Sequence, residues 1–463
     1  MNNFNKLPIA IIGAGPIGLA AAAHLSQKGQ PFIIFEAGNQ IAANIRSWEH
    51  VAMFSPWKYN IDSASSEILS RYDWTKPDRN NIPTGRELIE QYLIPLSETD
   101  EIKPHIRLNS KVISISRKRI NKIKNYGRET APFVLHVQSE GYSVVAAYAR
   151  AVIDASGTWQ NPTPMGSAGL PVSGELEYKD HIHYGIPDIL GTHSDRYLTK
   201  NVAVIGSGHS AINALLELAD LKKQSPTMKL FWILRKSNVS DAYGGLDNDE
   251  LPGRGRVGQR VKELVEDRQV EVLTPFFVDA ISKAENRIII TGESNKGVEQ
   301  VVVDEIIVAT GLKPDLEMLR ELRISLDTIV ESPVNLAPLI DPNIHSCGSV
   351  EPHGEAELSH PEKDFYIVGM KSYGRAPTFL LATGFEQVRS VVAALTGDWK
   401  AAKEVQLELP ETGVCGVPKA IDPNSLTQEI PVSSCCDSKI PSSCDENSAD
   451  EPKAIRQEQR TKH

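Results

Sequence analysis

The sequence is poor in several features that would assign it to a specialised class of protein. It has only five cysteines, an odd number that begins late in the chain at Cys347, which does not suggest a disulfide framework. No apolar run is long enough to span a bilayer, and the first residues lack the shape of a secretory signal. The net charge of −10 argues against a general nucleic-acid binder. We therefore expect a cytoplasmic protein with neither a membrane nor a nucleic-acid partner, and the oligomeric state stays open.

At 463 residues, the chain is longer than one hydrophobic core usually supports. It shows no internal repeat of solenoid period. Its organisation therefore has to be found from local motifs, and two of these stand out as glycine-rich turns.

The first glycine turn lies in the segment LPIAIIGAGPIGLAAAAHL. The apolar run Ile9–Ile12 predicts a buried parallel strand, and an alanine-rich helix follows the glycines. Gly13 permits a tight turn, Gly15 lets the backbone approach a pyrophosphate, and Gly18 lets the helix pack on the strand. The next strand, PFIIFEAG, ends in Glu36, at the distance where a ribose-binding acid belongs. This pattern predicts a dinucleotide site.

The second glycine turn lies in KNVAVIGSGHSAINALLELADL and repeats this pattern after a strand at Val202–Ile205. Alanine stands where the third glycine would be. The following strand ends in Arg235 and Lys236 where an NAD enzyme would carry an acid, and two cations there suit the 2′-phosphate of NADPH. The predicted NADPH contacts are therefore Gly206, Ser207, Gly208, His209, Ser210, Ala211, Arg235 and Lys236.

Two dinucleotide sites in one chain predict two cofactors that exchange a hydride, FAD at the first turn and NADPH at the second. The small-residue turns in RAVIDASGT and VATG resemble those that, in two-dinucleotide-binding flavoproteins, mark where the chain crosses between the domains. A last helix that begins near Thr383–Gly384 points its positive end toward the flavin ring. Besides the first turn and Glu36, the predicted FAD contacts are Ala37, Trp48, Ser55, Trp57, Thr310, Gly311, Gly369 and Thr383, with Phe54 beside Trp57.

GAGPIG, GSGHSA and VATG, in this order, resemble the two-dinucleotide-binding flavoproteins and, among them, the flavin-containing monooxygenases. The resemblance covers about residues 5–400. It implies an α/β fold of two nested Rossmann-like domains. The FAD-binding domain is expected at 1–165 and 305–405, the NADPH-binding domain at 166–304, and a disordered, cysteine-containing tail at 406–463.

A narrower resemblance rests on the segments FSPWKYNID, PTGRELIEQYL, LIDPNIHSCG, MKSYGRAPTFLL and LPETGVC. These are similar to the flavoproteins encoded in bacterial arsenic-resistance operons. That resemblance implies an NADPH- and FAD-dependent monooxygenase that uses dioxygen to oxidise trivalent arsenicals or antimonials. Such a reaction needs little from side chains beyond positioning, so we expect no catalytic triad.

The polar tail carries thiols that could serve this chemistry. Cys435, Cys436 and Cys444 form a soft-ligand set for a trivalent metalloid, with Cys415 as a fourth candidate. Unselected drift and a redox dithiol relay are the alternatives. Upstream, HSCGSVEPHGEAELSH has no trusted zinc spacing, and Cys347 and His353 within it could instead line the approach of the substrate.

Four functions follow from these features. The first is oxygenation of trivalent arsenic or antimony, and the second is oxygenation of an organic nitrogen or sulfur nucleophile. The third is an NADPH-dependent reductase of the same fold, although the sequence lacks an active-site C-x-x-C or C-x4-C pair near a flavin-facing turn. The fourth, a thiol-rich metalloid buffer, would leave two intact nucleotide turns unused.

Overall fold

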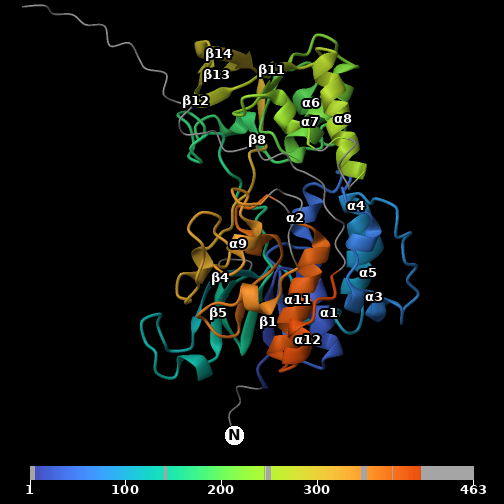
Figure 1. The fold of residues 1–463 in the computed structure, drawn as a ribbon, viewed down its shortest axis with the longest axis vertical. Helices are drawn as coiled ribbons and strands as arrows, with labels where there is room; N and C mark the ends of the chain where they lie inside the picture. Colours follow the sequence, from blue (N-terminus) through green and yellow to red (C-terminus); the bar gives the residue numbers. More distant parts are fainter. Residues whose placement is uncertain are drawn as a thin grey trace, which may run out of the picture. The chain divides into compact units, whose positions relative to one another are not determined.

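The computed structural model describes residues 6–139, 143–244, 246, 252–345, 352–377 and 379–407. The predicted tail beyond residue 407 and all five cysteines lie outside these ranges. Within residues 1–418, which form one compact unit, two parallel sheets carry the two glycine turns (Figure 1).

The first parallel sheet has the strand order β16-β7-β1-β2-β3. The central strand β1 is fully buried and pairs with β7 on one side and β2 on the other. Strand β16 comes from far along the sequence and pairs in parallel with β7. The five strands are β1 (Ile9–Ile12), β2 (Phe32–Phe35), β3 (Ile106–Arg107), β7 (Ala151–Asp154) and β16 (Phe365–Ile367).

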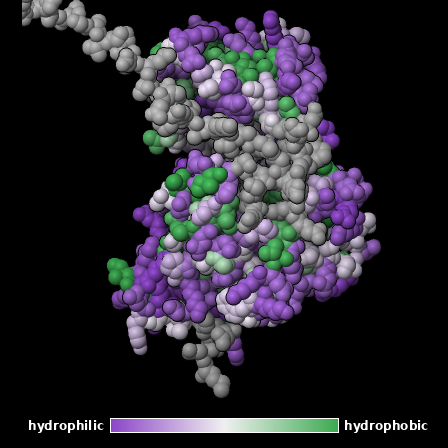
Figure 2. All heavy atoms as spheres, in the orientation of Figure 1, coloured by the Kyte–Doolittle hydropathy of each residue, from purple (hydrophilic) through white to green (hydrophobic). Residues whose placement is uncertain are grey.

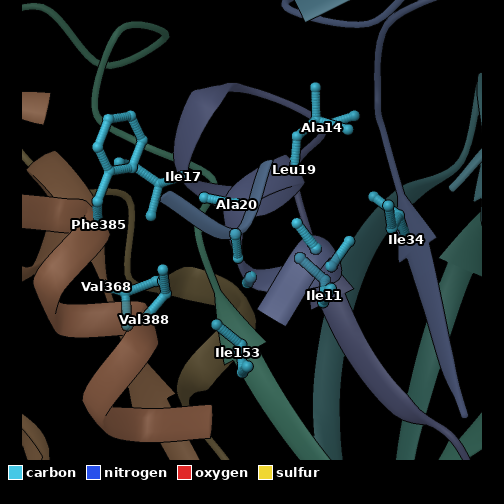
Figure 3. Close-up of a cluster of buried hydrophobic side chains, with 14 of the residues drawn as sticks. Ile11, Ala14, Ile17, Leu19, Ala20, Ile34, Ile153, Val368, Phe385 and Val388 are labelled. Carbon is cyan, nitrogen blue, oxygen red and sulfur yellow. The ribbon is translucent and has the colours of Figure 1, made fainter. Parts of the chain in front are cut away.

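Helices α1 (Pro16–Gln27) and α11 (Leu381–Leu395) run side by side along this sheet (Figure 1). Figure 3 shows Phe385 and Val388 of α11 directed toward Ile17 and Ala20 of α1, with Val368 between the helix and the sheet. The alanine run of α1 is completely buried, because only small side chains allow a helix to approach its neighbours this closely. This packing fixes the position of the first glycine turn.

The second parallel sheet has the order β11-β10-β9-β15-β8. Its central strand β9 lies between β10 and β15, and helices α7 and α8 pack against each other beside it. The strands are β8 (Ile182–Tyr184), β9 (Val202–Ile205), β10 (Leu230–Ile233), β11 (Glu271–Leu273) and β15 (Glu305–Val308). The helices are α7 (His209–Lys222) and α8 (Pro252–Glu266).

Two antiparallel sheets of three strands complete the strand inventory of the described residues. In each, hairpin-connected strands alternate buried and exposed side chains, so that one face packs on the protein. They are β4 (Lys111–Arg117), β5 (Phe133–Gln138) and β6 (Val144–Ala149), and β12 (Phe276–Ala284), β13 (Arg287–Ser294) and β14 (Gly297–Val303).

The remaining helices are short, and no helix in the described ranges is long and apolar enough to cross a membrane. On the face shown in Figure 2, hydrophobic side chains form small separate groups on a mostly hydrophilic surface. The short α-helices are α2 (Ala43–Arg46), α3 (Ser63–Leu69), α4 (Gly85–Leu88), α5 (Ile94–Ser97), α6 (Ser194–Tyr197), α9 (Ala337–Ile340), α10 (Glu355–Leu358) and α12 (Trp399–Lys403), and η11 (Gly369–Tyr373) is a 3-10 turn.

The sheets bear on the predicted domain boundaries of 1–165, 166–304 and 305–405. Strand β15 falls on the FAD side of the boundary after residue 304, yet it is hydrogen-bonded within the second sheet. The boundaries remain a prediction, and this pairing favours placing the second one after Val308.

Candidate functional site

The first glycine turn joins β1 to α1 in a backbone that requires glycine at two of its three positions. Gly13 has a φ of +98°, and its N–H donates to the carbonyl of Phe35 at 2.8 Å. A Cβ on Gly18 would lie 1.9 Å from the carbonyl oxygen of Gly13. At Gly15, by contrast, no atom lies within 4 Å of an added Cβ. The space above Gly15 can therefore take a pyrophosphate at the N-terminus of α1.

Glu36 is fixed beside this turn immediately after β2. Its carboxylate accepts the N–H of Ala14 at 2.7 Å and the N–H of Gly38 at 2.8 Å. Only 8% of the residue is exposed, whereas the neighbouring Ala37 is exposed. These two bonds leave oxygen lone pairs that can accept from ribose hydroxyls, which fits the predicted role of Glu36.

The second turn repeats this backbone between β9 and α7. Gly206 has a φ of +134°, and a Cβ there would lie 2.2 Å from the carbonyl oxygen of Ala309. Gly208 precedes the helix with nothing within 4 Å of an added Cβ, as at Gly15. Ala211 is completely buried at the third position, and the carbonyl of Gly206 accepts the indole N–H of Trp232 at 2.8 Å.

The two predicted phosphate-binding cations follow β10, but they differ in what they contact. Lys236 donates to the backbone carbonyl of Asp241 at 2.6 Å. Arg235 is exposed and donates a long hydrogen bond of 3.4 Å to the carbonyl of Ser167. Arg235 is therefore the better placed of the two to bind a 2′-phosphate.

Three elements of the predicted FAD site converge on Ile17, the second residue of α1. A Cβ on Gly369 would lie 3.1 Å from the side chain of Ile17, and one on Gly384 would lie 2.5 Å from it. Ile17 and Phe385 lie next to each other in Figure 3. The first glycine turn, η11 and the start of α11 are thus neighbours, as a shared cofactor site requires.

A buried ion pair lies at the carboxyl edge of this sheet. Lys371 donates to Asp154 at 2.7 Å and to the hydroxyl of Ser156 at 3.0 Å, and that hydroxyl donates to Asp154 at 2.6 Å. The side chains of Lys371 and Asp154 are almost completely buried. The pair therefore holds the turn after β7 against η11.

The predicted flavin wall is only partly available to a ligand. Trp57 is 3% exposed within the hydrophobic core, and the hydroxyl of Ser55 donates to Asn60 at 2.8 Å. Trp48 is half-buried and lies 6.2 Å from the ring of Trp159. Of the three predicted residues, Trp48 has the most surface to offer, and the roles of all three remain predictions.

The turn that contains Thr310 and Gly311 lies against the segment around Thr163, where the chain passes from the first parallel sheet to the second. The Thr310 hydroxyl donates to the carbonyl of Thr163 at 2.7 Å, and the N–H of Thr163 donates to Gly311 at 2.9 Å. Pro162 and Leu312 form an antiparallel bridge. The two crossovers between the sheets therefore run side by side, and the hydrogen bond of the Thr310 hydroxyl helps to hold them together.

Thr383 and His209 each contact an aromatic ring. Thr383 is buried in the first turn of α11 and is hydrogen-bonded to the hydroxyl of Tyr373, whose pKa is raised by burial. His209 begins α7, and its ring lies 4.6 Å from that of Phe54. Neither observation assigns a catalytic role.

Glu217, further along α7, lies close to a second ionisable side chain, that of His50. Burial raises the pKa of Glu217 to about 7, and burial also lowers the pKa of His50. Their nearest nitrogen and oxygen are 4.0 Å apart. Burial likewise lowers the pKa of His183 to about 4, and its ring lies 5.3 Å from that of His193.

The predicted metalloid ligands Cys435, Cys436 and Cys444 lie outside the described residues, as do Cys347 and Cys415. In the part of the chain that the structure describes, no group of His, Cys, Asp and Glu is arranged to hold a metal ion. His353 is buried and bonded to Gln387.

Sequence reasoning missed three residues near the first turn. Asn44 accepts from Gln160 at 2.8 Å, and a Cβ on Gly157 would lie 4.0 Å from its amide nitrogen. Lys371 and Gln387 are fully buried polar side chains next to predicted FAD contacts. Thr383, Gln387 and Ser390 recur at helical spacing on one buried face of α11, and this polar stripe on an apolar helix was the available signal.

Comparison with known proteins shows which folds and families this chain is similar to. The ferredoxin–NADP reductase of Lactobacillus johnsonii is 24% identical over 397 residues, covering 85% of this chain and 95% of that protein. The bacillithiol disulfide reductase of Bacillus cereus has a TM-score of 0.61 at 18% identity, covering 86% and 99%. The cadaverine monooxygenase of the desferrioxamine pathway from Erwinia amylovora has a TM-score of 0.59 at 13% identity, covering 87% and 98%. The structural likenesses confirm the predicted fold.

The family of pyridine nucleotide-disulphide oxidoreductases matches residues 10–346. FAD and NADP(H) are typical cofactors of this family, and the open glycines at Gly15 and Gly208 fit their pyrophosphates. The predicted pair of cofactors is thereby confirmed, together with a flavoprotein oxidoreductase activity. The chain belongs to the pyridine nucleotide-disulphide oxidoreductase family.

Proposed function

We propose that this chain is an NADPH-dependent flavoprotein reductase that passes electrons to a small-molecule acceptor. The observation that carries the proposal is the pair of glycine turns, which share one backbone geometry on two parallel sheets. The Lactobacillus johnsonii relative is a reductase by name, and the match covers nearly the whole length of that relative. This support favours a reductase over the oxygenase that the sequence resemblance implied.

In this proposal some residues bind the cofactors and others hold the surrounding turns in position. The N-termini of α1 and α7 bind the two pyrophosphates, Glu36 binds the ribose of FAD, and Arg235 binds the 2′-phosphate of NADPH. Lys371 and Asp154 hold the turn after β7 in place. FAD, when bound, accepts a hydride from the nicotinamide and delivers the electrons to the acceptor.

The acceptor is not a cysteine pair supplied by one of these turns. Neither glycine turn contains a cysteine, and all five cysteines follow residue 346. Ile17, which is apolar and 6% exposed, occupies the place where Gly369 and Gly384 meet α1. In this proposal the acceptor is an external small molecule, such as a quinone or a low-molecular-weight disulfide, and no cysteine of the two turns takes part.

Oxygenation is the second candidate. The fold of the cadaverine monooxygenase shows that this architecture can carry it, at an identity that supports the fold alone. Oxidation of trivalent arsenic or antimony rests on the sequence resemblance and on thiols outside the described residues.

The test is NADPH consumption by the FAD-loaded protein, first without oxygen and then in air. We expect a quinone or a disulfide to support turnover without oxygen. In air, arsenite should leave the rate unchanged, and peroxide should account for the NADPH consumed. Turnover that requires oxygen, accelerates with arsenite and yields arsenate with little peroxide would replace the reductase with the oxygenase.

A further inference from the structure

A buried group of hydrogen bonds connects α11 to the turn at Gly369. The N–H of Gly369 donates to Oε1 of Gln387 at 2.7 Å. Nε2 of Gln387 lies 2.9 Å from the hydroxyl of Ser372 and 2.9 Å from Nε2 of His353. The Ser372 hydroxyl donates to the carbonyl of Gly369 at 2.7 Å. Gln387 and Ser372 are completely buried, and His353 is 3% exposed.

The donors and acceptors in this group fix the orientation of the Gln387 amide. A backbone N–H can only donate, so the oxygen of Gln387 must face Gly369. The amide nitrogen then faces Ser372 and His353, and it can only donate to both. Nε2 of His353 must therefore accept a hydrogen bond, which requires an imidazole that is neutral at this nitrogen.

Protonation of His353 would break this arrangement. An imidazolium has two N–H donors, so two donors would then face each other between His353 and Gln387. Turning the amide over would satisfy His353 but would set the amide nitrogen against the N–H of Gly369. Either outcome leaves a buried donor without its acceptor, which disfavours the protonated form.

The position of this group ties it to the cofactor. Gly369 has a φ of +69° and contacts Ile17 of the first glycine turn. Val368 and Val388, the sequence neighbours of Gly369 and Gln387, lie side by side in Figure 3. A shift of Gln387 would therefore move the turn at Gly369, which is one of the residues predicted to hold FAD.

Among the described residues, the other ionisable groups on the surrounding elements have partners. The pKa of Tyr373, whose ring lies 5.6 Å from that of His353, is raised by burial, so this phenol stays neutral. The carboxylates and cations nearby are each hydrogen-bonded or ion-paired, namely Glu355 to Tyr366, Glu357 to Gly354, Glu386 to Arg389, and Lys371 to Asp154.

We infer that Gln387 is a positioning residue for the FAD site and that its hydrogen bonds make FAD binding depend on a neutral His353. This rests on the assignment of FAD to the first sheet and is independent of the acceptor that the reduced enzyme uses. A negative result here would leave the proposed reductase intact.

The experiment measures FAD affinity of the full chain by flavin fluorescence between about pH 8 and about pH 5, where an ordinary imidazole titrates. We expect the dissociation constant of the native protein to rise by roughly tenfold or more as the pH falls. His353→Gln keeps an acceptor that cannot titrate, so its FAD affinity should stay near the native value at pH 8 and change little with pH. His136→Gln removes an exposed imidazole of the same domain and should keep the native profile.

Gln387→Glu gives the sharpest test because it reverses the sign. Its carboxylate can accept from Gly369 and from a protonated His353, so FAD should bind more tightly as the pH falls. Gln387→Met should bind FAD weakly at every pH. Thermal melting of the FAD-free variants shows whether a substitution weakens FAD binding alone or destabilises the whole fold. Equal pH profiles in the native, His353→Gln and Gln387→Glu proteins would overturn the inference, as would no pH dependence in the native protein.

Discussion

The two glycine turns have almost the same backbone but are closed by different contacts. Gly15 and Gly208 both precede their helices with a φ of −84° and an extended ψ. At the first turn, only a hydrogen fits between Gly18 and the carbonyl of Gly13. At the second, the carbonyl of Gly206 bonds the indole of Trp232, and Ala211 fits at the third position. The third glycine of such a motif is therefore set by local packing, whereas the second is set by the space the ligand needs.

The largest test of this comparison exchanges the residues at the third position. Gly18→Ala should cost about 3 kcal/mol or more, because its Cβ would meet the carbonyl of Gly13 at 1.9 Å. We expect this variant to purify with little FAD and to melt at a lower temperature. The reciprocal Ala211→Gly should cost only about 1 kcal/mol of helix propensity. If both variants retain both cofactors equally, the packing explanation of the third position is wrong.

The second test addresses the residues that follow the second strand of each glycine-turn motif, Glu36 after β2 and Arg235 after β10. Arg235→Ala should raise the KM for NADPH roughly 10- to 100-fold by removing a charge-assisted contact to the 2′-phosphate, while NADH is used as before. Lys229→Ala removes an exposed cation at the opposite end of β10 and serves as the matched control. Equal losses with NADPH and NADH would show that Arg235 does not recognise the 2′-phosphate.

A third test concerns the ionisable side chains on the two helices. His24 of α1 lies 3.0 Å from Asp62, whereas Glu217 of α7 lies 4.0 Å from His50. Burial raises the pKa of Glu217 from 4.5 to about 7. Ionising it therefore costs more in the folded chain, so its contribution to stability is full below about pH 4.5 and is lost as the pH rises through 7.

Glu217→Gln should remove this loss, because the amide oxygen can still accept the N–H of Ile189. We expect the variant to be more stable than the native protein at pH 8 by roughly 1–2 kcal/mol and no more stable at pH 5. Thermal melting at the two pH values measures the difference. Glu271→Gln, at an exposed position on β11, is the control and should change the stability at neither pH. If Glu217→Gln loses as much stability between pH 5 and pH 8 as the native protein does, the Glu217 carboxyl is not the cause of that loss.

The smallest expected effect comes from the indole that closes the second turn. Trp232→Phe removes the hydrogen bond to Gly206 but keeps most of the buried ring, and it should cost about 1 kcal/mol. NADPH affinity should fall with it, while FAD content stays unchanged. An unaltered NADPH affinity would mean that the turn keeps its shape without this bond.

Much of the fold was readable from the sequence because its signals are local. The strands at Ile9–Ile12 and Val202–Ile205 were predicted with the bounds that the structure shows, since apolar runs that end in glycine leave little choice. The last helix was expected near Thr383–Gly384 and begins at Leu381. The pairing of β15 with the second sheet was not readable, because it depends on contacts between segments far apart in sequence.

The candidate site also contains residues that the sequence could identify and residues that it could not. The residues of the two turns could be predicted because spacing and backbone conformation decide them. The burial of Trp57 in the core could not be predicted, because the sequence does not distinguish a buried tryptophan from one that faces a ligand, and its role at the flavin stays a prediction. Lys371, Asp154 and Gln387 could not be assigned, because each needs a partner supplied by another element.

The position of β16 has a consequence for how the protein is made. This strand completes the first sheet beside β7, yet the whole of the second sheet is translated between the two. The second sheet is contiguous in sequence and can form while the ribosome is still extending the chain, whereas the first must wait for a distant segment to return. FAD can therefore be captured only late in biosynthesis, and a chain that stops before α11 would carry a nicotinamide site without a flavin site.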